Sequence, residues 1–153
     1  MRTFLITIQF ILLLSGCAQQ NAFERFNFSS VKELSEDSIQ TVKIKNNTSE
    51  VEGIITVVYL NKVLPELYNK HEYFYIYYYI KDKNSSVTFT LNGKSSLLQE
   101  ELKPENEFSY LTSFSAPWSK YYLVGFEKEG NILNFKVETS KQGSATLKFV
   151  KDK

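Results

Sequence analysis

The sequence predicts an all-β domain, an antiparallel sandwich of about seven or eight strands, and three observations lead to this fold class. After residue 50, β-branched and aromatic residues alternate with polar residues in short runs. Turn-forming residues separate these runs at a spacing of about ten residues, which is typical of antiparallel sandwiches. No run with helical periodicity is long enough to connect two parallel strands across a sheet.

Each predicted strand is an alternating run between turn residues, so that one set of side chains faces a core and the other faces away from it. Asn92-Gly93 is a strong signal for a two-residue hairpin turn. The predicted strands are Ile54–Leu60, His71–Ile80, Val87–Leu91, Leu97–Leu102, Phe108–Phe114, Lys120–Phe126, Leu133–Glu138 and Ala145–Phe149.

The first 16 residues are predicted to be an export signal. Arg2 is followed by an apolar stretch from Phe4 to Leu14, which only Thr7 and Gln9 interrupt. This stretch is too short to span a bilayer as a stable helix. The sequence therefore predicts a segment that directs export and is then removed.

The segment Leu14-Ser15-Gly16-Cys17 resembles the lipobox of bacterial lipoproteins, because small residues precede the only cysteine of the chain. The resemblance implies that the Cys17 thiol receives a diacylglyceryl group, that a peptidase cuts after Gly16, and that the new amino terminus is acylated. Several acyl chains anchor a protein stably, whereas a single myristoyl chain binds marginally. The alternative is an ordinary secretory signal with a cysteine at the cleavage point by chance.

Removing residues 1–16 from a chain of 153 leaves 137 residues, which is enough for one domain with a substantial core. We expect residues 17–49 to form a lipidated tether, because they are rich in polar residues. Within this tether, Ser30–Val42 could hold a short helix, or Val42–Ile44 could begin a first strand. The β-sandwich domain is expected from residue 50 to residue 153.

Charge and cysteine content exclude several classes of function. Without Arg2, the 18 basic side chains fall to 17, which equals the 17 acidic side chains. This balance gives no electrostatic reason to expect binding to nucleic acid. Once Cys17 is acylated, no thiol remains for a disulfide, for redox chemistry or for a metal site. We expect no cofactor and no metal, and we expect packing to supply the stability.

The run from Tyr73 to Ile80 is the most aromatic in the chain, and it places four tyrosines on one face of a strand. The opposite, apolar set is the natural core face. Two interpretations of the tyrosine face stay open. It is either the outer surface of a central strand, covered by other parts of the chain, or an exposed binding surface, since tyrosine offers a large contact area with few torsions to freeze. The predicted binding residues are Tyr73, Tyr75, Tyr77 and Tyr79.

Two further residues are singled out by their surroundings. Trp118, which follows Pro117, is expected to fill a gap in the core, because large aromatic side chains are mostly buried; a loop anchor is the alternative. Asn84 lies in the segment Asp82-Lys83-Asn84-Ser85-Ser86, which fits the extended bacterial sequon for attachment of a glycan to asparagine. The predicted hairpin turn would expose Asn84.

The sequence offers little support for catalysis, and we predict no catalytic residues. The only histidine, His71, has no neighbouring nucleophile and no metal-ligand spacing, so we expect it at the surface or at a strand edge. The acidic pairs Glu100-Glu101 and Glu105/Glu107 lack the pattern of a calcium loop. Solvent-exposed positions are therefore expected for these four carboxylates.

A lipobox, a short tether and a single β-rich domain with many Tyr, Phe, Lys and Asn residues together resemble the small immunoglobulin-like lipoproteins of epsilonproteobacteria. The resemblance implies an immunoglobulin-like β-sandwich. The chain departs from antibody domains, because it lacks the pair of cysteines that joins their two sheets. The resemblance carries no catalytic motif.

These observations predict a non-enzymatic binding module in the cell envelope, held on the bilayer by acylated Cys17, in the outer rather than the inner membrane. Its partner is expected to be another envelope or surface macromolecule, a protein rather than a nucleic acid. One alternative is a structural factor in envelope assembly or maintenance. Another is an envelope enzyme whose carboxylate site only folding assembles.

Overall fold

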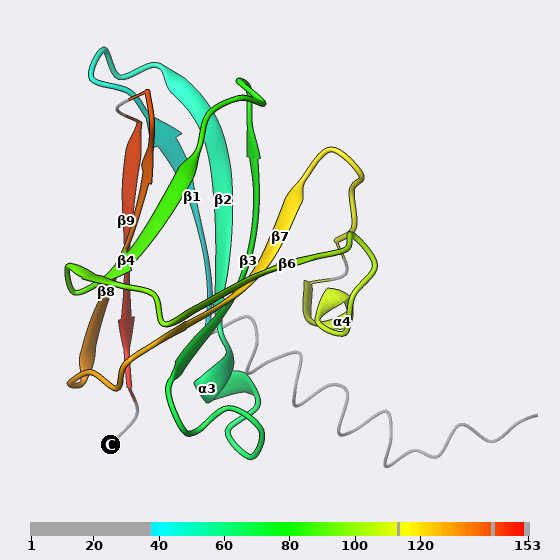
Figure 1. The fold of residues 1–153 in the computed structure, drawn as a ribbon, viewed down its shortest axis with the longest axis vertical. Coiled ribbons are helices and arrows are strands. Elements are labelled where there is room, and N and C mark those ends of the chain that lie inside the picture. Colours follow the sequence, from blue (N-terminus) through cyan, green and yellow to red (C-terminus); the bar gives the residue numbers. More distant parts are fainter. Residues whose placement is uncertain (1–37, 113, 142, 152–153) are drawn as a thin grey trace, which may run out of the picture. The chain divides into compact units, whose positions relative to one another are not determined.

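The computed structural model describes residues 38–112, 114–141 and 143–151, and within these residues the chain forms nine strands (Figure 1). All neighbouring strands pair antiparallel, in the order β5-β4-β8-β9-β1-β2-β3-β7-β6. The strands are β1 (Ile39–Lys45), β2 (Val51–Tyr59), β3 (Glu72–Ile80), β4 (Val87–Leu91), β5 (Lys94–Ser95), β6 (Leu98–Leu102), β7 (Lys120–Phe126), β8 (Ile132–Thr139) and β9 (Ser144–Val150).

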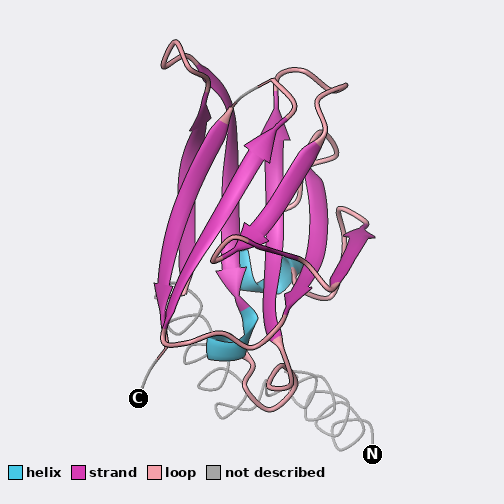
Figure 2. Cartoon of the chain, turned by 60° about the vertical axis from the view of Figure 1, so that its left-hand side comes forward, coloured by secondary structure: helices cyan, strands magenta, loops and turns pink. Residues whose placement is uncertain are grey.

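The antiparallel all-β class predicted from the sequence is confirmed, whereas a sandwich of seven or eight strands is not. The described strands belong to one curled sheet (Figure 2). Its weakest junction lies between β1 and β9, where the pairing is limited to Lys45 and Ser144. The Gln40 side chain adds one hydrogen bond across this junction, to the backbone carbonyl of Lys148 at 2.5 Å.

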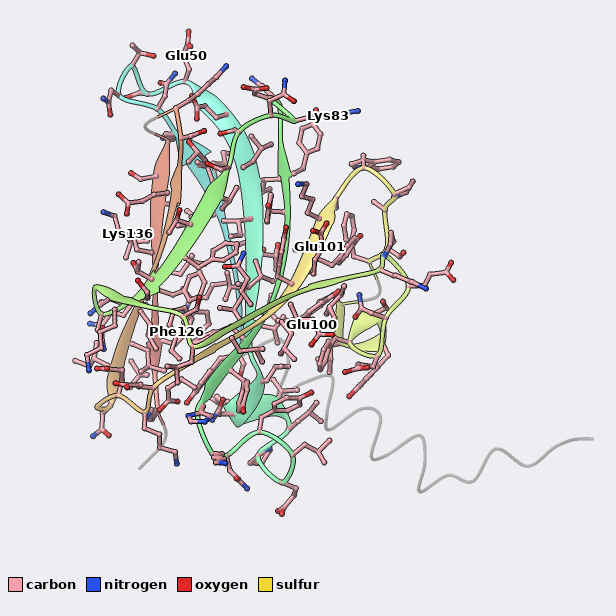
Figure 3. All side chains as sticks on the ribbon, in the orientation of Figure 1. Glu50, Lys83, Glu100, Glu101, Phe126 and Lys136 are labelled. Carbon is pink, nitrogen blue, oxygen red and sulfur yellow. The ribbon has the colours of Figure 1, made fainter. Side chains whose placement is uncertain are left out.

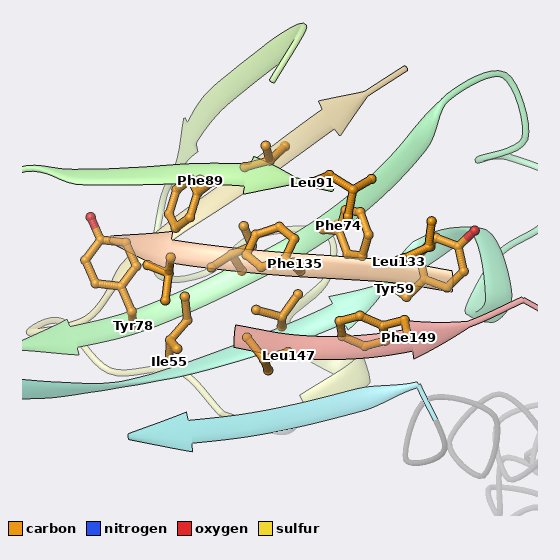
Figure 4. Close-up of a cluster of buried hydrophobic side chains, with 14 of the residues drawn as sticks. Ile55, Tyr59, Phe74, Tyr78, Phe89, Leu91, Leu133, Phe135, Leu147 and Phe149 are labelled. Carbon is orange, nitrogen blue, oxygen red and sulfur yellow. The ribbon is translucent and has the colours of Figure 1, made fainter. Parts of the chain in front are cut away.

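The curl brings strands that are not neighbours in the sheet against one another around a single core (Figure 4). Phe74 of β3 contacts Phe135 of β8, with ring centroids 5.0 Å apart, and Phe149 of β9, at 5.6 Å. Tyr78 of β3 meets Phe89 of β4 at 6.1 Å. The core is therefore built from the inner faces of the two parts of the sheet, which lie on either side of the junction between β1 and β9. The alternation of apolar residues predicts such a core face.

A second cluster covers the outer face of β2, β3 and β7. Two short helical turns, α3 (Leu60–Val63) and α4 (Ser109–Thr112), contribute to this cover. The fully or nearly fully buried members of the cluster are Val58, Leu60, Val63, Tyr75, Phe108, Leu111 and Tyr121. Strand β3 is thus buried on both faces for most of its length.

One predicted strand is wrong: in place of a strand over Phe108–Phe114, the chain makes the helical turn α4. The Asn106 side chain accepts a hydrogen bond from the Phe108 N–H at 2.9 Å, which starts a turn rather than an extended run. Phe108 and Leu111, three residues apart, then point to the same side and are buried. The spacing of these two apolar residues was the missed signal.

The first strand forms where the sequence left two alternatives. Residues 39–45 are β1, so the strand beginning near Val42 is correct for the described part of the segment. The β domain consequently starts before the boundary predicted at residue 50. Asn92-Gly93 makes the predicted hairpin turn, since both residues have positive φ, 49° and 82°.

The buried carboxylate of Glu72 ties together several segments at one end of the domain. Glu72, which is 1 % exposed, accepts hydrogen bonds from the Tyr59 hydroxyl at 2.6 Å and from the Glu129 N–H at 3.2 Å. The ammonium group of Lys151 lies 2.5 Å from the same carboxylate. Burial and the adjacent Glu72 raise the pKa of Tyr59 above its usual range. This network joins β2 and β3 to the loop after β7 and to the C-terminal end of β9.

Candidate binding site

The tyrosine face predicted as a binding surface is largely covered by the chain itself. Tyr75 is fully buried, Tyr73 and Tyr77 are half-buried, and Tyr79 alone among the four is exposed, at 39 %. Phe108 lies on Tyr75, with ring centroids 5.1 Å apart, and burial raises the pKa of Tyr75 to about 12. The interpretation of this face as a surface covered by other parts of the chain therefore holds at Tyr75, so Tyr75 is not available as a binding residue in this fold.

Trp118 occupies the opposite environment from the one predicted. It is 65 % exposed, so it does not fill the core. The fully buried Tyr121 holds the turn that carries Trp118. Its hydroxyl accepts a hydrogen bond from the Ala116 N–H at 2.7 Å and donates one to the Ala116 carbonyl at 3.1 Å. The Ser119 N–H also donates to this carbonyl, at 3.1 Å. The only tryptophan of the chain is thus presented to solvent by a hydrogen-bonded turn.

Exposed apolar side chains gather around Trp118 and form what we call the aromatic patch: Ile54, Tyr79, Phe114 and Trp118. Ile54 and Tyr79 face each other across the ladder of β2 and β3. The Phe114 ring stacks on Tyr77 with centroids 5.0 Å apart. The patch lines a shallow hollow of about 350 Å³. Exposed aromatic side chains grouped in this way mark interaction sites more often than scattered ones do.

A second hollow, of about 380 Å³, also has Trp118 in its wall. We call it the polar hollow, because four charged residues are among those that line it. Its lining includes the acidic residues Asp82 and Glu101 and the basic residues Lys83 and Lys120. Figure 3 shows Lys83 at the tip of the connection between β3 and β4, and Glu101 on β6. Trp118 therefore lines both hollows.

The two carboxylates of the polar hollow are held by hydrogen bonds. Asp82 lies 2.6 Å from the Lys141 ammonium group and accepts the Asn84 N–H at 3.1 Å. These two contacts hold the pKa of Asp82 below its usual range. Glu101 accepts a hydrogen bond from the Tyr122 hydroxyl at 3.2 Å. Asp82 is consequently a fixed, ionised hydrogen-bond acceptor at neutral pH.

The remaining residues predicted from the sequence fall in different places. Asn84 is exposed in the loop after β3, as expected for a residue that could carry a glycan. His71 is half-buried beside Tyr73, with ring centroids 5.9 Å apart, just before β3 begins. Glu100, Glu101, Glu105 and Glu107 are exposed. Cys17 and the predicted signal segment lie outside the described residues.

Comparison with known proteins gives no relative. No family model, no curated protein and no solved structure matches the chain. The candidate site therefore rests on the geometry of the described residues. Across this described part, no group of three or more His, Cys, Asp or Glu side chains is placed to hold a metal ion. The same part contains no helix that is long and apolar enough to cross a membrane.

The aromatic patch as a whole is not predicted from the sequence. Finding it requires two properties that a local pattern does not report: which apolar side chains are exposed, and which of them lie close together. Ile54 and Phe114 were assigned to predicted strands, and Trp118 to the core. One local signal was available: Pro117 and Ser119 flank Trp118, and such residues favour turns over buried strands. The polar hollow has no local signal, because its walls come from three segments distant in sequence.

We predict that Tyr121→Phe lowers the free energy of unfolding by about 1–3 kcal/mol, because the buried Ala116 N–H loses its acceptor while the ring packing is kept. Tyr79→Phe is the matched control. It removes a hydroxyl from an exposed side chain, so we expect a change within about 0.5 kcal/mol. Urea denaturation of both variants measures the difference, and equal midpoints would show that the Tyr121 hydroxyl does not hold the turn.

Proposed function

We propose that this chain is a bacterial lipoprotein, anchored in the cell envelope by lipid on Cys17, and that its β domain is a non-enzymatic binding module. Its partner is an envelope or surface macromolecule, which contacts the aromatic patch. The observation that carries the binding part is Trp118, an exposed aromatic side chain on a fixed turn. Such residues supply much of the binding energy at interfaces, because they bury large areas on contact.

Anchoring is supported by the sequence around Cys17, where a charged start, an apolar stretch and small residues precede the only cysteine. We place the lipoprotein in the outer membrane. The proposal includes a relation to the small immunoglobulin-like lipoproteins of epsilonproteobacteria. The packing of two parts of the sheet across one core supports a sandwich-like description of the domain.

An enzyme is the less supported alternative, although the polar hollow holds two carboxylates, Asp82 and Glu101. A carboxylate pair that acts as acid and base needs one member with a raised pKa. The pKa of Asp82 is lowered instead, by Lys141 and by the Asn84 N–H. Asp82 is therefore suited to accept hydrogen bonds rather than to donate a proton.

The anchor is tested by Cys17→Ser. Serine cannot supply the thiolate that takes the diacylglyceryl group, so we expect loss of lipid and accumulation of the uncut precursor. Metabolic labelling with a palmitate analogue, followed by separation on gels, measures both effects. Ser15→Ala keeps a small residue before the cysteine and should be labelled like the wild type. Undiminished label on Cys17→Ser would rule out lipidation at this position.

Binding is tested by placing a photo-crosslinking residue at Tyr79, in the aromatic patch, or at Ile132, another exposed apolar position, on β8. In cells that produce the full-length protein, we expect discrete crosslinked species from position 79. Trp118→Ala should reduce their yield at least about tenfold, as for loss of an interface hot spot. Identical crosslinking patterns from positions 79 and 132 would contradict a binding role for the patch. They would favour the structural role in envelope assembly.

A further inference from the structure

We propose that the polar hollow beside Trp118 binds a pyranose ring of an uncharged saccharide, so that the macromolecular partner is a glycan. This inference rests on the proposed function and deepens it, because it replaces the protein partner expected from the sequence with a polysaccharide or oligosaccharide. Three features of the hollow carry it: an exposed aromatic wall, a rim of fixed polar groups, and balanced charge.

The aromatic wall is the indole of Trp118. One face of a pyranose ring presents C–H groups, whereas its edge presents hydroxyls. The C–H face therefore stacks on a flat aromatic surface, and the edge needs polar partners. At 65 % exposure the indole has the free area that such stacking requires. The bonds of Tyr121 to Ala116 fix the turn in advance, which lowers the entropic cost of binding.

The rim supplies partners for the hydroxyls. Asp82 is oriented by Lys141 at 2.6 Å and by the Asn84 N–H at 3.1 Å, so its carboxylate is a fixed acceptor. Glu101 accepts from Tyr122 through one oxygen, at 3.2 Å, and a carboxylate offers further lone pairs. Lys120 also lines the hollow, and a lysine side chain is a hydrogen-bond donor. Sugar hydroxyls both donate and accept hydrogen bonds, so different hydroxyls of one sugar can pair with each of these three groups.

An apolar protein side chain fits the same place less well. It would remove water from Asp82 and Glu101 and leave the lone pairs that their protein partners do not use without hydrogen bonds, which is unfavourable. Hydroxyl groups replace those bonds. The rim therefore favours a ligand that is apolar on one face and rich in hydroxyls at its edge.

The charge and the size of the hollow narrow the class of saccharide. Its lining includes two acidic residues, Asp82 and Glu101, and two basic residues, Lys83 and Lys120, so the lining carries no net formal charge that would select a charged sugar. Its volume of about 380 Å³ falls within the range of small-ligand pockets, about 300–1,000 Å³. A short stretch of a neutral glycan matches both properties.

The only tryptophan of the chain lies in the wall of the proposed site, so its fluorescence reports binding directly. The full-length lipoprotein, in a detergent without a sugar headgroup, is titrated with chitohexaose, cellohexaose and maltohexaose. Quenching of the tryptophan by acrylamide is followed. We expect at least one of these oligosaccharides to protect Trp118 in a saturable manner.

Matched variants separate the rim from the rest of the surface. Asp82→Asn and Glu101→Gln should each lower the affinity for the oligosaccharide that protects Trp118 at least tenfold. Glu127→Gln, which removes an exposed carboxylate that does not line the hollow, should leave the affinity within twofold. Thermal melting of each variant shows that the fold is kept. Unchanged affinity of both rim variants overturns the assignment of the ligand to this hollow.

Failure of this inference can be told apart from failure of the proposed function. If none of the three oligosaccharides protects Trp118 while crosslinking from position 79 persists, the saccharide is excluded and the binding module stands with another partner, such as a protein. If both signals are absent, the aromatic patch is not a binding surface.

Discussion

The requirement that β3 be covered on both faces determines much of this structure. Its inner face carries Phe74 and Ile76, which the curled sheet buries. Its outer face carries Tyr75, which no strand can cover, because the curl of the sheet encloses the inner side. A half-polar ring such as tyrosine can be buried only where its hydroxyl finds a partner, and Asn106 donates to it at 3.4 Å. The segment between β6 and β7 supplies this cover.

The position of Trp118 follows from that cover. The chain leaves β6, places Phe108 and Leu111 on the outer face, and must then return to begin β7. The return turn is tied to the sheet by Tyr121, itself part of the buried outer cluster. Trp118 lies on this turn, and no part of the described chain packs over most of its surface. The packing that covers the outer face of β3 thus also places an exposed aromatic residue on a fixed turn.

Local patterns in the sequence predicted the ladder strands well, because alternation directly reports which residues share a face. The apolar residues Phe135 and Leu147 lie in the core as the pattern requires. Alternation does not report whether a face is covered, since the covering segment lies far away in the sequence. Alternation therefore leaves the tyrosine face between two interpretations, and it does not reveal that Tyr75 is buried or that Trp118 is exposed. The α4 turn was missed because an Asn106 side-chain bond and a helical spacing of apolar residues outweighed an apparent alternation.

Trp118 is exposed on a turn that hydrogen bonds fix, and fluorescence of the unliganded full-length protein tests both properties because the chain has a single tryptophan. Acrylamide quenching reports exposure, and time-resolved fluorescence anisotropy reports local rotation of the indole. We expect efficient quenching together with an anisotropy decay dominated by tumbling of the whole particle. Emission that resists quenching would place the indole in a core. A dominant nanosecond local rotation would show that the turn does not hold it.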